Sequence, residues 1–273
     1  MSRHPFDLLM ELRSELIRLD CAALHLAHDA YPALDVRRYL VRLDEMAEDV
    51  AAQRPGLSAI WRYEAMRRIV VERYGLTGNH DDYYDPDNGY LHCVLDRRRG
   101  IPISLSIVWL AVARRLKWTV SGVAFPGHFL VRFDDPERLV LADPFHDGRT
   151  LSLDDCRHML AERYDRKIEL RPSLLKPVGT RAILARVLRN LRNIYLANDD
   201  WPRLMLTLRR MAAVEPRNGR HLQELAAVCC RRGDVRGACA HLELYLRRVP
   251  EGPDARLARH NLRQLHVALI ALN

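Results

Sequence analysis

Three polar side chains of this sequence have types and spacing that could support nucleophilic catalysis. Ser104 follows Gly100-Ile101-Pro102, which has the pattern of a helix start, and His128 and Asp143 follow at later turns of the chain. A hydroxyl beside an imidazole, with a carboxylate behind that imidazole, is the arrangement in which a base activates a nucleophile. His128 and Asp143 stand fifteen residues apart with a turn between them, so neighbouring antiparallel strands would place them side by side.

The same three residues also have an ordinary structural interpretation. A serine in the first turn of a helix often caps that turn or bonds back to the backbone. A histidine held by an aspartate can be a structural pair, a general base or a ligand-binding pair. Ser104 is therefore a candidate nucleophile only, and both interpretations of His128 and Asp143 stay open from the residues alone.

A loop rich in aspartate and tyrosine is a candidate binding surface. Residues 81–88 contain four aspartates and one asparagine. Their spacing resembles a calcium loop, but the glycine at position six and the terminal glutamate of such loops are missing. We expect turns and tyrosine packing here, with Tyr83, Tyr84 and Asp85 as binding candidates and with no metal or cofactor. Arg98 is a further binding candidate, although a cation at a helix C-terminus also suits the helix dipole.

Hydrophobic periodicity predicts helices before the candidate histidine and strands around it. Apolar residues recur at spacings of three and four in the first part of the chain, and the period changes towards two after Trp118. Predicted helices cover residues 6–28, 36–50, 58–74, 90–98, 102–117 and 152–163. Predicted strands cover residues 120–125, 129–133 and 139–142. Helices followed by an antiparallel meander indicate a mostly helical α+β fold.

The C-terminal part repeats itself with a period of 34 residues. Asp200 and Asp234 each open a predicted helix, and Pro216 and Pro250 are separated by the same 34 positions. Helix–turn–helix units with this period are typical of tetratricopeptide (TPR) repeats. Helices are expected at about 180–197, 200–214, 218–232, 234–249 and 254–271.

Four motifs resemble the bacterial SirB family of transglutaminase-like proteins with C-terminal TPR repeats. They are Asp-Tyr-Tyr-Asp-Pro at 82–86, Leu-Asp-Arg-Arg-Arg-Gly-Ile-Pro-Ile-Ser-Leu-Ser at 95–106, Phe-Pro-Gly-His-Phe-Leu-Val-Arg at 125–132 and Asp-Pro-Phe at 143–145. The resemblance implies a transglutaminase-like (papain-like) core with a small antiparallel sheet, followed by an all-α TPR array. It places an N-terminal helical region at 1–75, the core at 76–172 and the repeats at 178–273.

The resemblance also implies a departure at the nucleophile. In the wider transglutaminase pattern the central helix begins Gly-x-Cys, and a strand histidine and a following aspartate serve as base and orienting residue. Laid over this sequence, Gly100 takes the glycine position, His128 and Asp143 take the base and orienting positions, and Pro102 takes the cysteine position. Proline has no attacking atom, so the resemblance implies a core that has lost its nucleophile. Cys93 lies on the preceding predicted helix and does not match that position.

Composition and charge favour a globular protein that meets a protein partner. The 273 residues are 48% hydrophobic and 29% charged, which suffices for a core. Six cysteines form no CxxC pair, and we expect no membrane span, no secretory signal and a cytoplasmic location. Residues 1–170 carry 24 basic and 27 acidic side chains, whereas residues 171–273 carry 19 and 8. A basic helical array favours an acidic peptide or protein partner over nucleic acid, because no nucleic-acid-binding motif is present.

Two functions follow from these observations. The first is a non-catalytic interaction or regulatory protein, a pseudoenzyme core whose TPR array binds a protein or acidic peptide. The alternative is a hydrolase or acyltransferase of unknown substrate, with Ser104 attacking, His128 as base and Asp143 orienting it. The sequence leaves the partner, the substrate and the oligomeric state open.

Overall fold

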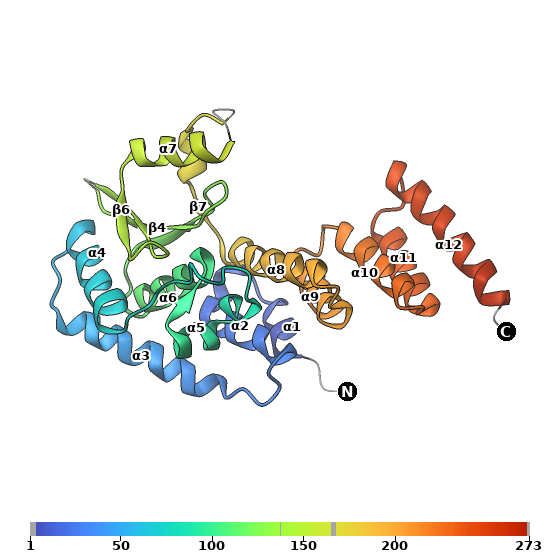
Figure 1. Cartoon of the computed structure of the whole chain (residues 1–273), viewed down its shortest axis with the longest axis horizontal. Coiled ribbons are helices and arrows are strands. Elements are labelled where there is room, and N and C mark those ends of the chain that lie inside the picture. Colours follow the sequence, from blue (N-terminus) through green and yellow to red (C-terminus); the bar gives the residue numbers. More distant parts are fainter. Residues whose placement is uncertain (1–3, 137, 165–167, 272–273) are drawn as a thin grey trace. The chain divides into compact units, whose positions relative to one another are not determined.

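The computed structural model describes residues 4–136, 138–164 and 168–271 of the chain. The chain forms two compact units, one spanning Leu12–Val187 and the other combining Met1–Glu11 with Leu188–Asn273. Helices and a small sheet make up the first unit, and helices make up the second (Figure 1). The predicted α+β core followed by a helical array is therefore confirmed.

The part of the chain before the sheet is helical. α3 (Val36–Ala52) begins at Asp35, whose side chain accepts a hydrogen bond from the Arg37 amide. α4 (Ala59–Arg67) begins at Ser58 and continues into a π-helical segment, η3 (Arg68–Arg73). Both starts match the predicted ones, because Asp and Ser side chains satisfy the amides that a helix start leaves without partners.

The predicted continuous helix over residues 6–28 is wrong. The chain instead forms α1 (Pro5–Leu9), η1 (Ser14–Leu16), α2 (Leu19–Leu26) and η2 (Ala27–Asp29). The backbone is extended at Ile17 and Arg18, immediately before α2. The break leaves α1 in one compact unit and α2 in the other. The apolar period is present in each short helical segment, so it did not show that extended residues separate the segments.

Five strands form an antiparallel sheet in the order β6-β5-β4-β3-β7. They are β3 (Val120–Val123), β4 (Leu130–Asp134), β5 (Leu139–Asp143), β6 (Arg149–Leu151) and β7 (Pro177–Val178). Val123 pairs with Leu130 across the first hairpin, and Val131 pairs with Ala142 across the second. The three central strands lie where alternation predicted them. β6 and β7 span only three and two residues and are too short to give a period-two signal.

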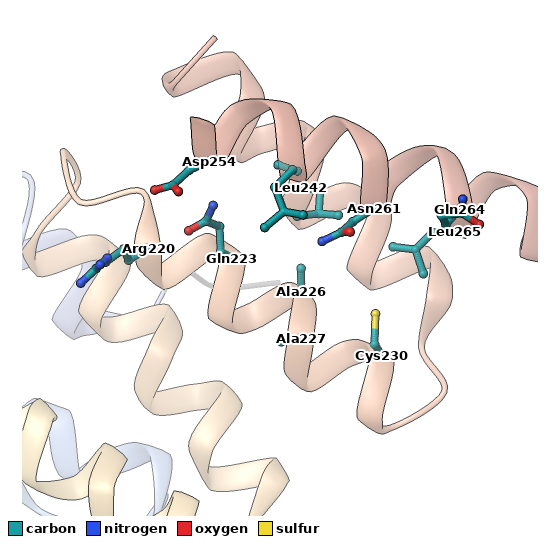
Figure 2. Close-up of a pocket in the computed structure, with 12 residues that line it drawn as sticks. Arg220, Gln223, Ala226, Ala227, Cys230, Leu242, Asp254, Asn261, Gln264 and Leu265 are labelled. Atoms are coloured by element: carbon teal, nitrogen blue, oxygen red, sulfur yellow. The ribbon is translucent and has the colours of Figure 1, made fainter. Parts of the chain in front are cut away.

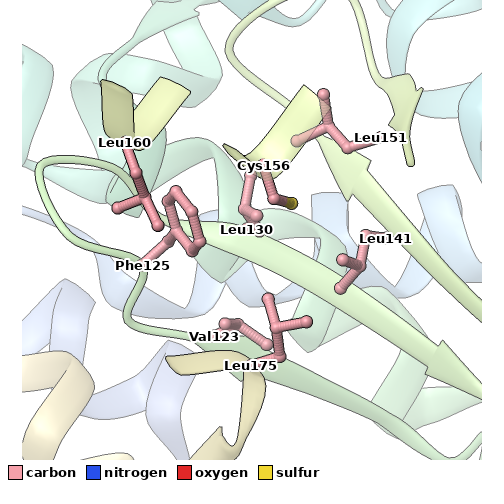
Figure 3. Close-up of a cluster of buried hydrophobic side chains, with 8 residues drawn as sticks. All are labelled: Val123, Phe125, Leu130, Leu141, Leu151, Cys156, Leu160 and Leu175. Atoms are coloured by element: carbon pink, nitrogen blue, oxygen red, sulfur yellow. The ribbon is translucent and has the colours of Figure 1, made fainter. Parts of the chain in front are cut away.

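Helices cover both faces of this sheet. On one face, α7 (Leu153–Tyr164) contributes Cys156 and Leu160 to a buried cluster that also includes Leu130 and Leu141 from the strands (Figure 3). On the other face, the ring of Trp109 in α6 (Pro102–Arg115) packs edge-on to Phe133. α6 is buried over nearly its whole length, as its apolar sequence predicts.

A short parallel strand pair links the start of α6 to the segment after β5. β1 (Thr77–Gly78) pairs with β2 (Arg99–Gly100), which follows η4 (Pro86–Gly89) and α5 (Leu91–Arg97). The Gly78 amide donates to the Phe145 carbonyl at 3.1 Å. A Cβ atom at position 78 would lie 2.4 Å from that carbonyl oxygen, so the close approach requires glycine.

The second unit is a helical repeat array. It contains α9 (Trp201–Val214), α10 (Arg220–Arg231), α11 (Val235–Arg248) and α12 (Pro253–Ala271), preceded by α8 (Thr180–Ala197), in which the chain passes between the units. Asp200 and Asp234 cap α9 and α11 through the same side-chain bond, and the residues before them, Asp199 and Gly233, both have positive φ. The 34-residue period is thus a repeat of local geometry. Within the described residues, no helix combines the length and apolar character needed to cross a membrane.

Candidate functional site

The structure brings His128 and Asp143 together. His128 lies in the turn between β3 and β4, where its amide donates to the Phe125 carbonyl at 2.9 Å and Gly127 adopts a φ of 71°. Asp143 is the last residue of β5. Because β4 and β5 are antiparallel neighbours, the His128 Nε2 atom lies 2.8 Å from the Asp143 Oδ1 atom. Both residues are buried.

Asp143 has a second imidazole partner, His146. The His146 Nδ1 atom lies 2.6 Å from Asp143 Oδ2, and the backbone amides of Phe145 and His146 donate to Oδ1 at 3.1 and 3.4 Å. Burial alone would raise the pKa of Asp143, but its contacts with His128 and His146 outweigh burial and hold the pKa below its ordinary value. Asp143 is therefore an ionised carboxylate between two imidazoles.

His146 was not among the site residues predicted from the sequence. Its side chain is 41% exposed, whereas that of His128 is 8% exposed. The available signal was the spacing Asp143-x-x-His146 directly after a strand. In a turn this spacing returns the second side chain to the first, but the same spacing is common in turns without any site.

Aromatic rings surround the imidazoles. The buried ring of Phe145 lies 4.5 Å from the ring of His80 and 5.9 Å from the ring of Tyr83, centroid to centroid. The ring of His128 lies 6.2 Å from that of Phe145. Tyr83 is thus linked to the histidine cluster through Phe145, while Tyr84 is 74% exposed and packs edge-on to Tyr83. The predicted tyrosine packing is present, and Tyr84 is the more accessible of the two rings.

The first turn of α6 is occupied by structural contacts. Pro102 is its first residue, and Ser106 donates to the Pro102 carbonyl at 2.7 Å. The Ser104 hydroxyl lies 2.6 Å from the Asn88 carbonyl and 3.1 Å from the Ile101 carbonyl, and it accepts the Ile101 amide at 3.1 Å. Ser104 is 1% exposed. Its hydroxyl therefore joins the helix start to the preceding loop.

The remaining two predicted binding residues also have local partners. Asp85 caps η4 and pairs with Arg97 at 2.5 Å. Arg98 ends α5 in the left-handed conformation with a φ of 59°, and its carbonyl accepts the Thr77 amide at 3.1 Å. Its side chain is exposed. Asp85 and the backbone of Arg98 thus stabilise the local structure around α5. Of these two binding candidates, Arg98 is the one whose side chain is exposed.

Cys93 and His92 form a cysteine–histidine contact away from Asp143. The Cys93 Sγ atom lies 3.2 Å from the His92 Nε2 atom. Burial raises the pKa of the Cys93 thiol to about 11, so the group is a thiol rather than a thiolate near neutral pH. The His92 ring packs edge-on to Tyr31 and Tyr39. This contact belongs to a buried aromatic cluster and lacks the electropositive setting of a reactive cysteine.

The repeat unit contains a hollow between α10 and α12 (Figure 2). It has a volume of about 550 Å³. Its lining combines the amide side chains of Gln223, Asn261 and Gln264 with the apolar side chains of Leu242 and Leu265. One arginine and one aspartate, Arg220 and Asp254, also line it. Cys230 lies on α10 within the same lining and is exposed.

The fold and these two sites define a transglutaminase-like core joined to a TPR array. A family model described as the transglutaminase-like superfamily matches residues 37–189, and a tetratricopeptide repeat model matches residues 191–263. A UPF0162 protein of Xylella fastidiosa is 34% identical over 261 residues, which cover 93% of this chain and 92% of that protein. The chain therefore belongs to the UPF0162 proteins of the transglutaminase-like superfamily.

Two further relatives differ in how much of their length is shared. UPF0162 protein PA3419 of Pseudomonas aeruginosa is 36% identical over 180 residues, which cover 66% of this chain and 65% of that protein. F-box only protein 21 of mouse is 28% identical over 196 residues, which cover 69% of this chain but 29% of that protein. No solved structure matches the chain. The similarity to the F-box protein thus concerns one part of a longer polypeptide.

Proposed function

We propose that this chain is a non-catalytic, cytoplasmic interaction protein of the SirB type, in which the transglutaminase-like core is a pseudoenzyme and the TPR array binds a segment of a partner protein. The observation that carries this proposal is the first turn of α6. There the residue that the resemblance aligns with the nucleophile is Pro102, and the neighbouring Ser104 hydroxyl is bonded to backbone groups.

Pro102 removes two catalytic groups at once. Proline offers no side-chain oxygen or sulfur atom for attack, and it also has no backbone N–H. Acyl-transfer enzymes commonly use a backbone N–H near the nucleophile to stabilise the oxyanion. The neighbouring Ile101 amide already donates to the Ser104 hydroxyl. Position 102 therefore provides neither an attacking atom nor a backbone N–H to stabilise an oxyanion.

The hollow of the repeat unit supports a protein segment as ligand. Carboxamide side chains both donate and accept, so Gln223, Asn261 and Gln264 suit the amide and carbonyl groups of an extended peptide. Leu242 and Leu265 offer apolar surface for its side chains. The charges of Arg220 and Asp254 oppose each other within the lining. The proposed preference for acidic segments therefore rests on the wider excess of basic residues in the C-terminal part.

A peptide selection tests the binding role. A random-peptide phage library is selected on the full chain, and enriched peptides are measured by fluorescence anisotropy. We expect acidic peptides whose affinity falls as salt rises, and a loss of at least about tenfold in Asn261→Ala. His260→Ala is the matched control, because His260 is the exposed neighbour on α12 outside the lining. Failure to enrich any peptide, or equal losses in both variants, would contradict the proposal.

The alternative is a hydrolase or acyltransferase that uses Ser104, His128 and Asp143, and the 2.8 Å contact between His128 and Asp143 favours it. A fluorophosphonate probe separates the two functions, because it labels activated serines. We expect no labelling of the wild-type chain, since the Ser104 hydroxyl is buried and bonded to carbonyl groups. Labelling that disappears in Ser104→Ala and in His128→Ala would establish the enzyme instead.

A further inference from the structure

We propose that His128, Asp143 and His146 form a binding site for a divalent transition-metal ion, and that Zn²⁺ is the ion that suits it best. These three residues are a group in the described part of the chain that offers one ligand atom each, with all the ligand atoms within 4.8 Å of one another. The proposal is independent of the peptide-binding role, because it uses no residue of the repeat unit.

The chemistry of the three side chains matches zinc. Two imidazole nitrogens and one carboxylate oxygen are a set that binds Zn²⁺ at about 2.0–2.2 Å and leaves a fourth, open position for water or another ligand. Calcium and magnesium prefer oxygen ligands, so they fit this set poorly. The nitrogen–oxygen separations of 2.6 and 2.8 Å are slightly shorter than a tetrahedral ion requires. Small side-chain rotations would open them.

His128 is the fixed member of the set. It is 7% exposed, and its Nε2 atom is buried without an aligned hydrogen bond to any described residue, even though Asp143 Oδ1 lies only 2.8 Å away. A ring nitrogen that is close to a carboxylate but not directed along a hydrogen bond leaves a buried polar group unsatisfied. A metal ion shared by both groups would satisfy the nitrogen and the oxygen together.

The surroundings supply support and access. The amides of Phe145 and His146 donate to the Asp143 carboxylate and hold it in place, which is the outer-shell arrangement that orients metal ligands. His146 contacts the other carboxylate oxygen, Oδ2, and its side chain is 41% exposed, so an ion can reach the cluster from solvent. The site therefore has one fixed imidazole, one oriented carboxylate and one adjustable imidazole.

Metal titration of the full chain tests the proposal. The purified protein is stripped with a chelator, and Zn²⁺ binding is measured by calorimetry, while Co²⁺ serves as a spectroscopic substitute. We expect one equivalent of Zn²⁺ to bind and Co²⁺ to show the intense visible absorption of a tetrahedral site. His146→Gln should weaken Zn²⁺ binding by about 100-fold, since it removes a direct ligand and even outer-shell losses reach 10–100-fold.

A second histidine variant serves as the control for His146→Gln. His158→Gln removes an exposed imidazole on α7 and should leave the affinity unchanged. Both variants keep the six cysteines, so any thiol-bound zinc is the same in each. Their thermal unfolding in excess chelator shows whether His146→Gln folds normally. A loss of about tenfold or more that is specific to His146→Gln supports the site. A smaller loss, or no stoichiometric binding by the wild-type chain, would overturn it.

Discussion

Two buried carboxylates in the same compact unit have opposite kinds of partner. Asp20 is 1% exposed and lies 2.9 Å from an Arg18 nitrogen and 2.8 Å from an Arg115 nitrogen. Asp143 is 0% exposed and lies between the imidazoles of His128 and His146. Guanidinium groups stay charged and only donate, whereas imidazoles can be neutral and can bind metals. Burial and pairing are thus the same for a structural ion pair and for a candidate functional site. The two carboxylates differ in the type of side chain that pairs with them.

Removal of the Asp20 carboxylate should have the largest effect. Asp20→Ala removes a buried carboxylate and leaves the half-buried Arg115 guanidinium with only the exposed Asp44 as carboxylate partner, and it should lower the free energy of unfolding by about 3 kcal/mol. Glu72→Ala is the control, because its pair with Arg67 is exposed and should contribute at most about 1 kcal/mol. Urea unfolding followed by circular dichroism measures both. Equal effects would remove the contrast between buried and exposed pairs.

Acid should remove part of the same stabilisation. Burial alone would raise the pKa of Asp20, but Arg18 and Arg115 outweigh it and hold the pKa below its ordinary value. A carboxylate with a lowered folded-state pKa stabilises the protein above its unfolded pKa of about 3.9 and loses that contribution as pH falls. The stability difference between the wild type and Asp20→Asn should therefore be constant near neutral pH and shrink below about pH 4. A difference that grows in acid would show the opposite linkage.

Asp143→Ala should have a smaller effect than Asp20→Ala, of about 2 kcal/mol. It removes the acceptor of two backbone amides and of the His146 imidazole, but it takes no carboxylate away from a guanidinium. Metal-free protein in chelator is the proper sample, so that bound ions do not add to the wild-type stability. If Asp143→Ala destabilises the chain as much as Asp20→Ala, the distinction between the two carboxylates fails.

Ser104→Ala should cost about 1 kcal/mol, because the Asn88 carbonyl and the Ile101 amide lose their shared partner. Ser106→Ala on the same helix removes only a bond back to the Pro102 carbonyl and should change stability by less than about 0.5 kcal/mol. Thermal unfolding of both variants measures the difference. Equal effects would mean that the Ser104 hydroxyl does not join the helix start to the loop.

The elements that the sequence predicted well are those with a strong period or a capping residue. Alternation located β3, β4 and β5, and the 34-residue period located α8 to α12 within a few residues. Asp200 and Asp234 signalled helix starts because their side chains satisfy the first free amides, and the structure has these bonds. The sequence alone predicts a helix start when a side chain caps the backbone amides next to it.

Features set by distant residues could not be predicted in this way. The extended residues Ile17 and Arg18 interrupt a continuous apolar period. His146 returns to Asp143 through a turn whose conformation depends on Gly78 and Phe145, which are far apart in the sequence. The approach of His128 to Asp143 was predictable because both positions flank one hairpin. The position of His146 could not be predicted without the conformation of the turn that follows β5.

The packing of α1 on α9 has a consequence for how the chain is made. Asp7 pairs with Arg210 at 2.5 Å, across a separation of 203 residues. At synthesis rates of about 5–20 residues per second, α1 emerges from the ribosome about 10–40 s before its partner helix. During that interval its apolar face, which includes the fully buried Phe6, is open to chaperones and to other nascent chains. The C-terminal unit thus completes its assembly only after translation has nearly ended.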